Sequence, residues 1–123
     1  MCKNSLRNDV IYYIMDNYGH APEYLWTKFP SYCIFRCPAN KKWYAVIMKV
    51  PKKQLLLKED EQIDILVVKA NSNEINNLLT KQGFLPAYHM NKKSWITILL
   101  DSSVAKEEIY KHIDESYKIV LKM

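Results

Sequence analysis

The sequence predicts an α+β fold, an antiparallel β-sheet with helices packed across one face in a two-layer sandwich. Two observations carry this prediction. Apolar residues follow a helical period near the N-terminus and a period of two from about residue 32, and short turns separate the strand-like runs that follow. Strands joined by short turns pair antiparallel, and the helical stretches supply the covering layer. With 123 residues, the chain is expected to form a single domain, residues 1–123.

The sequence predicts helices at residues 5–18, about 72–82 and about 103–121. Ser5 is placed to cap the first helix, and Gly19 is placed to end it. Asn71 is the expected N-cap of the second helix, where Glu74 three residues later resembles a capping box. Gly83 is expected to stop this helix.

The sheet is expected at about residues 32–70, with a last strand at 94–100. The strongest β-run is "KKWYAVIMKV" at residues 41–50. Strict alternation along it would place Trp43, Ala45 and Ile47 on one side and Tyr44, Val46 and Met48 on the other. "EDEQ" at residues 59–62 is interpreted as an acidic turn.

The charge is unevenly distributed along the chain. The net charge of +5 comes from 18 Lys and Arg residues against 13 Asp and Glu residues. Residues 28–58 contain eight basic residues and no acidic one, whereas acids collect at 59–64 and 101–115. This segregation can give one positive face that favours polyanions. The alternative is that the lysines are solvated and keep edge strands from pairing.

The expected compartment is the cytoplasm. No apolar run approaches the ~20 residues of a membrane helix, and the first residues lack the apolar region of a secretory signal. The number of cysteines is odd, and Cys33 and Cys37 are about 13 Å apart if they lie on one strand. A disulfide needs Cα atoms within about 7 Å, so free thiols are expected.

No metal, cofactor or catalytic activity is expected from the motifs. With only two glycines, the chain has neither a P-loop nor a dinucleotide-binding fingerprint. Cys2, Cys33, Cys37 and the three histidines do not form the paired spacings of a zinc site. The alternative that stays open is a Cys–His enzyme in which Cys33 or Cys37 approaches His89.

The stretch "PAYHMNKKSW" at residues 86–95 is the strongest candidate for nucleic-acid binding. Lysines neutralise phosphates, asparagine can hydrogen-bond base edges, and aromatic rings can stack on exposed bases. Asn91 and His89 are therefore candidates for the more specific contacts, and Tyr88 is a further candidate for DNA binding. The phosphate contacts are expected from three lysine pairs on turns of one sheet, Lys41 and Lys42, Lys52 and Lys53, and Lys92 and Lys93. Together the three pairs could form one gripping edge.

Several of these stretches resemble the MmcQ/YjbR family of small bacterial proteins. The similar segments are "WTKFPSYCIFR" (26–36), "NKKWYAVIMKVP" (40–51), "FLPAYHMNKKSWITILLD" (84–101) and "SYKIV" (116–120). The resemblance covers roughly residues 24–121 and implies a CyaY-like α+β fold and DNA binding, with loops of the sheet acting as paired wings. One departure is Ala87, which stands where the family often has glycine, and alanine disfavours positive φ.

Two functions follow as hypotheses. The first is a small non-enzymatic protein that binds DNA through lysine-rich loops. The second is a protein-interaction or small-ligand module of the same fold without nucleic-acid affinity, whose apolar groove would be lined by Tyr88, Met90 and Trp95. Lysine pairs clustered on one face favour the first hypothesis, and scattered lysines with an exposed aromatic groove favour the second. The sequence leaves the oligomeric state open.

Overall fold

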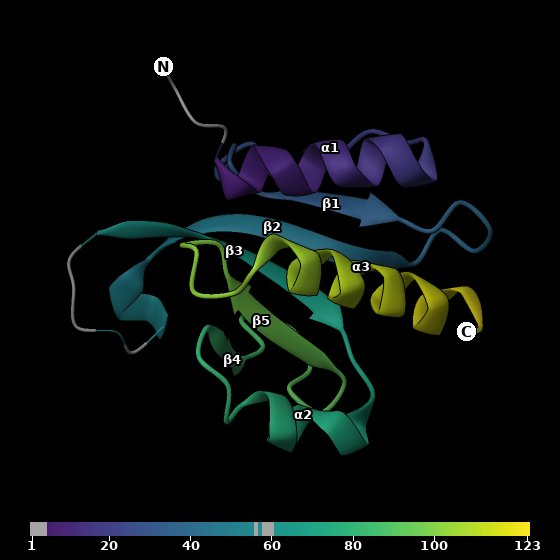
Figure 1. The fold of residues 1–123 in the computed structure, drawn as a ribbon. Helices are drawn as coiled ribbons and strands as arrows, with labels where there is room; N and C mark the ends of the chain where they lie inside the picture. The colour runs from purple at the N-terminus through teal and green to yellow at the C-terminus, as the bar shows by residue number, and fades with distance from the viewer. Residues whose placement is uncertain (1–4, 56, 58–60) are drawn as a thin grey trace.

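The computed structural model describes residues 5–55, 57 and 61–123 (Figure 1). In chain order the elements are α1 (Leu6–Tyr18), β1 (Cys33–Arg36), β2 (Trp43–Pro51), the 3₁₀ helix η1 (Lys52–Leu55), β3 (Gln62–Lys69), α2 (Ser72–Leu78), β4 (Phe84–Pro86), β5 (Trp95–Leu99) and α3 (Lys106–Leu121). Cys2 and much of the acidic turn expected at residues 59–62 lie outside the described residues.

The strands form one five-stranded sheet in the order β1-β2-β3-β5-β4, and every neighbouring pair is antiparallel. β3 lies at the centre, where Leu66 pairs with Ile47 of β2 and with Ile98 of β5. The predicted α+β fold is confirmed. Because β2 and β5 both pair antiparallel with β3, they run in the same direction.

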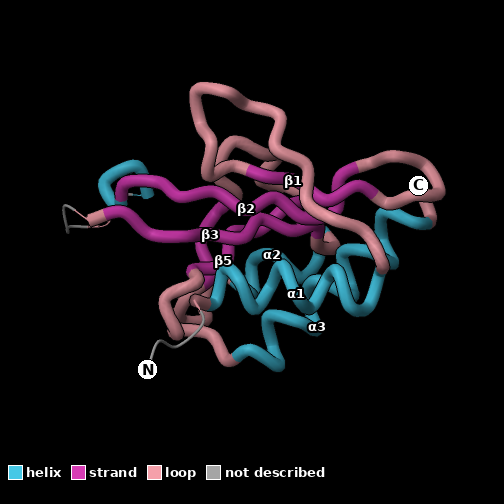
Figure 2. Tube along the Cα trace, turned by 90° about the horizontal axis from the view of Figure 1, so that it is seen from above, coloured by secondary structure: helices cyan, strands magenta, loops and turns pink. Residues whose placement is uncertain are grey.

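The two faces of the sheet are covered differently. Figure 2 shows all three α-helices on one side of the strands and long loops on the other. The side chains of the first face pack with α1 and α3 into the larger apolar cluster, which contains Val10, Ile14 and Ile113. The second face has its own cluster, in which Val46 and Ile65 pack against the segments around residues 26–32 and 87–90. We call these the helix face and the loop face.

A β-bulge changes the side-chain pattern expected for β2. Phe35 pairs with Ala45 whereas Arg36 pairs with Trp43, so Tyr44 is an extra residue on β2. Tyr44 and Ala45 consequently both pack into the cluster of the helix face, and Trp43 packs on the loop face. The strict alternation expected across residues 43–45 was therefore wrong.

The first helix follows the sequence prediction closely. The Ser5 side-chain oxygen accepts a hydrogen bond from the Asn8 backbone N–H at 3.1 Å, which caps the N-terminus. Gly19 adopts φ 72°, the left-handed conformation that ends helices, and its N–H donates to the Met15 carbonyl. Both expected caps of α1 are confirmed.

The second helix is shorter than expected and ends at Leu78. The Thr80 hydroxyl donates to the Asn77 carbonyl at 2.7 Å, and this side-chain bond closes the last turn before residue 82. Asn71 is the N-cap residue, but its side chain makes no capping bond and donates instead to the Glu74 carboxylate. Gly83 has φ 89°, and a Cβ there would lie 2.5 Å from Val104 Cγ2, so this position requires glycine.

Two further boundaries differ from the prediction. β4 was missed because it has only three residues, and it pairs along β5 from Phe84 opposite Ile98. The last helix begins at Lys106 and not near Ser103. Ser103 instead donates through its backbone N–H and its hydroxyl to the Asp101 carboxylate, which holds a separate turn before the helix.

Half-buried polar groups join α1, α3 and the sheet on the helix face. The hydroxyls of Tyr13 and Tyr18 donate to the two oxygens of the Asp114 carboxylate at 2.7 and 2.5 Å. The Tyr44 hydroxyl lies 2.7 Å from His20 Nε2. Burial and the bond to Asp114 raise the pKa of Tyr13 to about 12, so its hydroxyl keeps its proton near neutral pH. These contacts link α1 to α3 and the segment after α1 to the sheet.

Candidate nucleic-acid interface

Two turns with the same sequence, Asn-Lys-Lys, precede two strands of the sheet. In the first, the Asn40 side-chain oxygen accepts a hydrogen bond from the Lys42 N–H at 3.1 Å. In the second, the Asn91 side-chain oxygen accepts from the Lys93 N–H at 2.9 Å. Each asparagine thus folds its own backbone into an Asx-turn that leaves the lysines exposed.

The segment of residues 88–93, which we call the 88–93 loop, connects β4 to β5 across the loop face. The Tyr88 N–H donates to the hydroxyl of buried Thr97 at 2.9 Å, and the Tyr88 ring lies 4.1 Å from the His89 ring. The Asn91 carbonyl accepts from the Trp95 N–H at 2.9 Å. Both ends of the loop are therefore fixed to β5, while His89 remains exposed between them.

The backbone strain of this loop falls on His89 and not on Ala87. His89 has φ 60°, in the left-handed region, whereas Ala87 does not have positive φ. The Ala87 methyl is instead buried in the cluster of the loop face. The alanine at this position is therefore compatible with the backbone conformation.

The structure shows what Asn91 and Tyr88 do within the loop. The Asn91 side-chain oxygen accepts the hydrogen bond that shapes its own turn, and the side chain stays exposed. Tyr88 is half-buried and anchored through its backbone. His89, Lys92 and Lys93 are the exposed side chains that the loop presents.

Lys92 borders a cavity of about 340 Å³ between the 88–93 loop and η1. We call it the lysine hollow, and its lining consists of Gln54, Leu55, Leu85, Pro86, Ala87, Tyr88, His89 and Lys92. The hollow brings the 88–93 loop close to the 3₁₀ helix that begins with Lys52 and Lys53. Neither of these two lysines is without a partner in the structure.

The three lysine pairs do not form one edge. Lys42 directly precedes β2 and Lys52 directly follows it, so the ten residue steps from one to the other span roughly 33 Å. Lys41 and Lys42 lie in the hairpin between β1 and β2, which the Asn40 amide ties to the Val120 carbonyl of α3 at 2.8 Å. The expected single gripping edge is therefore replaced by two separated groups, one at the hairpin and one around the 88–93 loop and η1.

A second cavity, of about 260 Å³, lies on the loop face beside the first. We call it the aromatic hollow, and its lining consists of Trp26, Phe29, Tyr32, Trp43, Val46, Met48, His89 and Met90. His89 lines both cavities, so the two hollows adjoin at this residue. Lys28 is exposed between two of the lining aromatic residues.

The apolar groove expected from the sequence was to be lined by Tyr88, Met90 and Trp95, and the lining of the aromatic hollow differs from this set. Met90 does line the aromatic hollow, but Tyr88 lines the lysine hollow. Trp95 is only 7% exposed and lies beneath the Lys69 ammonium, 5.2 Å from the ring centroid. Trp26, Phe29 and Tyr32 were missed as site residues. The signal that could have identified them is the aperiodic run "YLWTKFPSY" at residues 24–32, where aromatic residues interleave with Lys28.

The structure separates the residues of the hypothetical Cys–His pair. Cys33 and Cys37 are fully buried in the cluster of the helix face, and burial raises the pKa of the Cys33 thiol. His89 lies across the sheet on the loop face. Within the described residues, no group of three or more His, Cys, Asp or Glu side chains is arranged to hold a metal ion.

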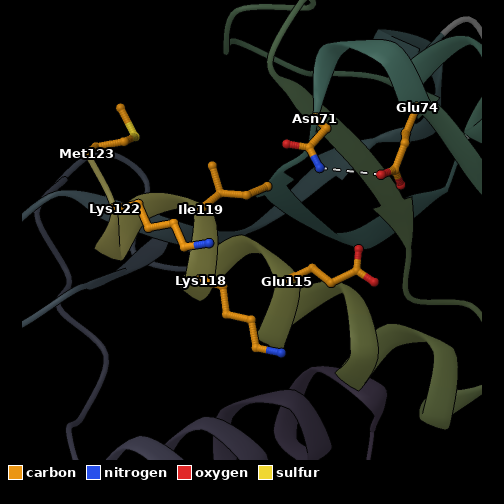
Figure 3. Close-up of a pocket in the computed structure, with 7 residues that line it drawn as sticks. All are labelled: Asn71, Glu74, Glu115, Lys118, Ile119, Lys122 and Met123. Carbon is orange, nitrogen blue, oxygen red and sulfur yellow. Dashed lines mark hydrogen bonds between the residues drawn. The ribbon is translucent and has the colours of Figure 1, made fainter.

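A larger cavity, of about 620 Å³, lies between the start of α2 and the end of α3 (Figure 3). Its lining carries both signs of charge, with Glu74 and Glu115 facing the same space as Lys118 and Lys122. Such a balanced surface gives no net attraction for a polyanion. The lysine and aromatic hollows differ, because no carboxylate is among their described lining residues.

Comparison with known proteins identifies the family. A family model described as YjbR matches residues 16–119. The chain belongs to the YjbR family. The resemblance inferred from the four sequence segments is thereby confirmed. Among the residues that the structure describes, no helix of this YjbR protein is long and apolar enough to cross a bilayer.

The relatives of this YjbR protein cover most of its length. It is 37% identical over 113 residues to "Uncharacterized protein YyaQ" of Bacillus subtilis, which covers 92% of this chain and 96% of the relative. It is 29% identical over 94 residues to "Uncharacterized protein YjbR" of Escherichia coli K12, covering 72% and 80%. Because these names assign no activity, the family membership does not by itself settle the function.

Solved structures show the same fold. A crystal structure of a Pseudomonas syringae protein aligns with a TM-score of 0.91 and 36% identity, covering 93% of this chain and 97% of that chain. The crystal structure of the Deinococcus radiodurans protein DR2400, of domain class DUF419, aligns with a TM-score of 0.72, covering 96% and 80%. At 20% identity, the second comparison supports the fold alone.

Proposed function

We propose that this YjbR protein is a non-enzymatic DNA-binding protein that contacts the phosphate backbone through its loop face. The observation that carries the proposal is the 88–93 loop, which presents exposed Lys92 and Lys93 beside two hollows without a carboxylate among their described lining residues. Lys28 and Lys42 are also exposed, and each is close in sequence to a residue that lines the aromatic hollow, Lys28 to Phe29 and Lys42 to Trp43. Exposed lysines in such a setting attract a polyanion strongly.

Two lysines on the side of the helix face differ from the exposed lysines of the loop face, because they form ion pairs within the protein. Lys81 pairs with Glu108 at 3.0 Å, and Lys106 pairs with Asp9 at 3.7 Å. The carboxylates partly neutralise the charge of these two lysines, so their electrostatic attraction for a phosphate is weaker. The positive charge of the loop face is therefore the better match for DNA.

The salt dependence of DNA binding tests the proposal. If Lys28, Lys42, Lys92 and Lys93 each neutralise one phosphate, log K should fall with log salt at a slope of about −3.6. A 20-base-pair duplex, followed by fluorescence anisotropy, should then bind roughly 150-fold more weakly at 200 mM than at 50 mM salt. Lys92→Glu/Lys93→Glu should reduce this ratio to roughly 12-fold or abolish binding.

Two further variants serve as matched controls. Lys111→Glu/Lys118→Glu makes the same charge change at exposed positions of α3 and should leave most of the affinity intact. Lys41→Glu/Lys42→Glu tests the separated hairpin and should have an intermediate effect, because of this pair only Lys42 is adjacent in sequence to a residue that lines the aromatic hollow, Trp43. Equal losses in all three variants would show a general charge effect. Binding of neither duplex nor single-stranded DNA at 50 mM salt would refute the proposal.

The aromatic hollow favours a second candidate function, a small-ligand or protein-interaction module without DNA affinity. Its half-exposed rings resemble the apolar lining of ligand sites. This alternative predicts that the protein binds a planar ligand with little dependence on salt and does not bind the duplex. The anisotropy titration above distinguishes the two functions, since only DNA binding gives the steep slope.

A further inference from the structure

We propose that the aromatic hollow receives one unstacked nucleobase of a DNA strand whose phosphates lie on Lys28 and Lys92. This inference rests on the proposed function and assigns the aromatic hollow a ligand of its own. It makes the protein a binder of single strands, or of duplexes with an unpaired base, in preference to perfect duplexes.

The walls of the aromatic hollow include Trp26, whose ring stands nearly perpendicular to two neighbouring rings. Trp26 stands at 83° to Trp43 with centroids 5.7 Å apart, and at 74° to Tyr32 with centroids 6.0 Å apart. Phe29 stacks on Tyr32 at 4.8 Å. Phe29 is 50% exposed, and Trp26, Tyr32 and Trp43 are half-buried. Ring surface is therefore available to a planar ligand that enters from solvent.

The floor and the size of the hollow limit what fits. Val46 and Met48 of β2 form an apolar floor, and Met90 of the 88–93 loop adds a flexible thioether. A volume of about 260 Å³ lies just below the ~300–1,000 Å³ of sites for drug-sized ligands. The hollow therefore suits a single ring system such as one nucleobase, which stacks on aromatic side chains whatever its identity.

The surrounding charge selects an anionic ligand over a cationic one. Perpendicular aromatic rings can also hold a quaternary ammonium group by cation–π attraction. Such a ligand would meet no carboxylate among the described lining residues of the hollow. Instead Lys28 lies between Trp26 and Phe29 in the sequence, and Lys92 borders the neighbouring hollow that shares His89. In a nucleotide, the base can stack on the aromatic rings while the phosphate pairs with the lysines.

A base can reach the hollow only when it is out of the stack. In a duplex the bases face inward, and taking one out costs unstacking and unpairing energy. A single strand or an unpaired base avoids most of this cost. The affinity for single strands should therefore exceed that for a perfect duplex at the same salt concentration.

Intrinsic fluorescence tests the stacking directly, because only three tryptophans are present. A 12-residue oligothymidylate added at 50 mM salt should quench the emission of half-exposed Trp26 and Trp43. The variant Trp26→Phe/Trp43→Phe keeps only buried Trp95, which does not line the hollow, and should show no quenching. The matched 20-base-pair duplex should quench the wild-type protein much less.

A single substitution at the rim measures the contribution of stacking to affinity. Phe29→Ala should weaken oligothymidylate binding by about 5- to 150-fold and leave duplex binding within twofold. Tyr12→Ala, at a 54% exposed position on α1, removes a comparable ring from the helix face and should change neither affinity. Because both sites are open to solvent, the two variants should fold.

The outcomes separate this inference from the proposed function. Salt-sensitive duplex binding with neither quenching nor tighter binding of oligothymidylate would overturn the base site and leave DNA binding in place. Binding of neither probe at 50 mM salt would overturn both. Quenching by choline chloride and not by oligothymidylate would show a cation cage, which also overturns the base site.

Discussion

The two faces of the sheet use similar residues in different ways. On the helix face, polar side chains form hydrogen bonds with one another. Tyr13 and Tyr18, for example, both donate to the Asp114 carboxylate. On the loop face, aromatic rings are only partly covered. Exposed Lys92 borders a hollow that has no carboxylate among its described lining residues. The helix face therefore supplies stability, and the loop face offers a binding surface.

The two Asn-Lys-Lys turns differ in the same way, because one packs against a helix and the other lies at the candidate binding surface. Both have the same Asx hydrogen bond to the second lysine. The Asn40 amide also donates to the Val120 carbonyl near the end of α3, so the first turn is part of the packing of the helix. The second turn lies beside the lysine hollow. Identical local sequence thus gives a structural turn in one place and a candidate contact in the other.

The largest expected difference between the faces is in the free energy of unfolding. Ile113→Ala empties a fully buried position on the helix face and should lower it by about 2–5 kcal/mol. Phe29→Ala removes a half-exposed ring from the loop face and should lower it by less than about 1 kcal/mol. Urea unfolding followed by circular dichroism measures both. Similar losses in the two variants would show that the rim of the aromatic hollow is part of the core.

A smaller difference is expected between the two asparagines. Asn40→Ala loses two hydrogen bonds and should lower the free energy of unfolding by about 1–2 kcal/mol, whereas Asn91→Ala loses one exposed side-chain bond and should lower it by about 0.5–1 kcal/mol. Urea unfolding again gives the values. Asn40→Asp keeps the turn acceptor but loses the donor to Val120, so it separates the two bonds. A larger loss at Asn91 than at Asn40 would contradict the comparison.

The sequence predicts both caps of α1 and the antiparallel sheet, because these depend mostly on local chemistry. Ser5 and Gly19 act through bonds within one turn, and the short connections between strands permit only antiparallel pairing. The bulge at Tyr44 could not be predicted from the sequence. One inserted residue reverses the alternation of side chains along β2, and Trp, Tyr and Ala can each pack on either face of the sheet. β4 escapes because three residues show no period.

The site could be predicted only in part, for a related reason. Lys92 and Lys93 stand out in the sequence by their Asn-Lys-Lys turn, and the structure leaves both exposed. The lysine pairs at 41–42 and 52–53 look equivalent in the sequence. In the structure they lie at opposite ends of the long strand β2, which keeps them far apart. The walls of the aromatic hollow come from segments far apart in the chain, so only the fold brings Trp26, Trp43 and Met90 together.

The smallest expected effect concerns pH and the buried histidine of the helix face. His112 is 8% exposed, and its ring meets Phe84 edge-on at 5.2 Å. Burial lowers the pKa of His112 below its ordinary 6.5, against the opposing pull of Glu115 and Glu108. As the pH falls below about 6.5, the unfolded chain takes up a proton that the folded chain resists, so the free energy of unfolding should decrease. Above that pH both states are neutral at this residue, and its contribution is constant.

Urea unfolding between pH 8 and pH 5 measures this dependence, and His112→Gln should flatten it. Glu108 gives a sharper test, because its carboxylate lies 3.6 Å from His112 Nε2 and favours the protonated ring. Glu108→Gln should therefore lower the pKa of His112 further and deepen the loss of stability at acid pH. A shallower loss in Glu108→Gln would mean that the imidazolium is not disfavoured in the folded protein, and that the helix face tolerates charge better than its packing implies.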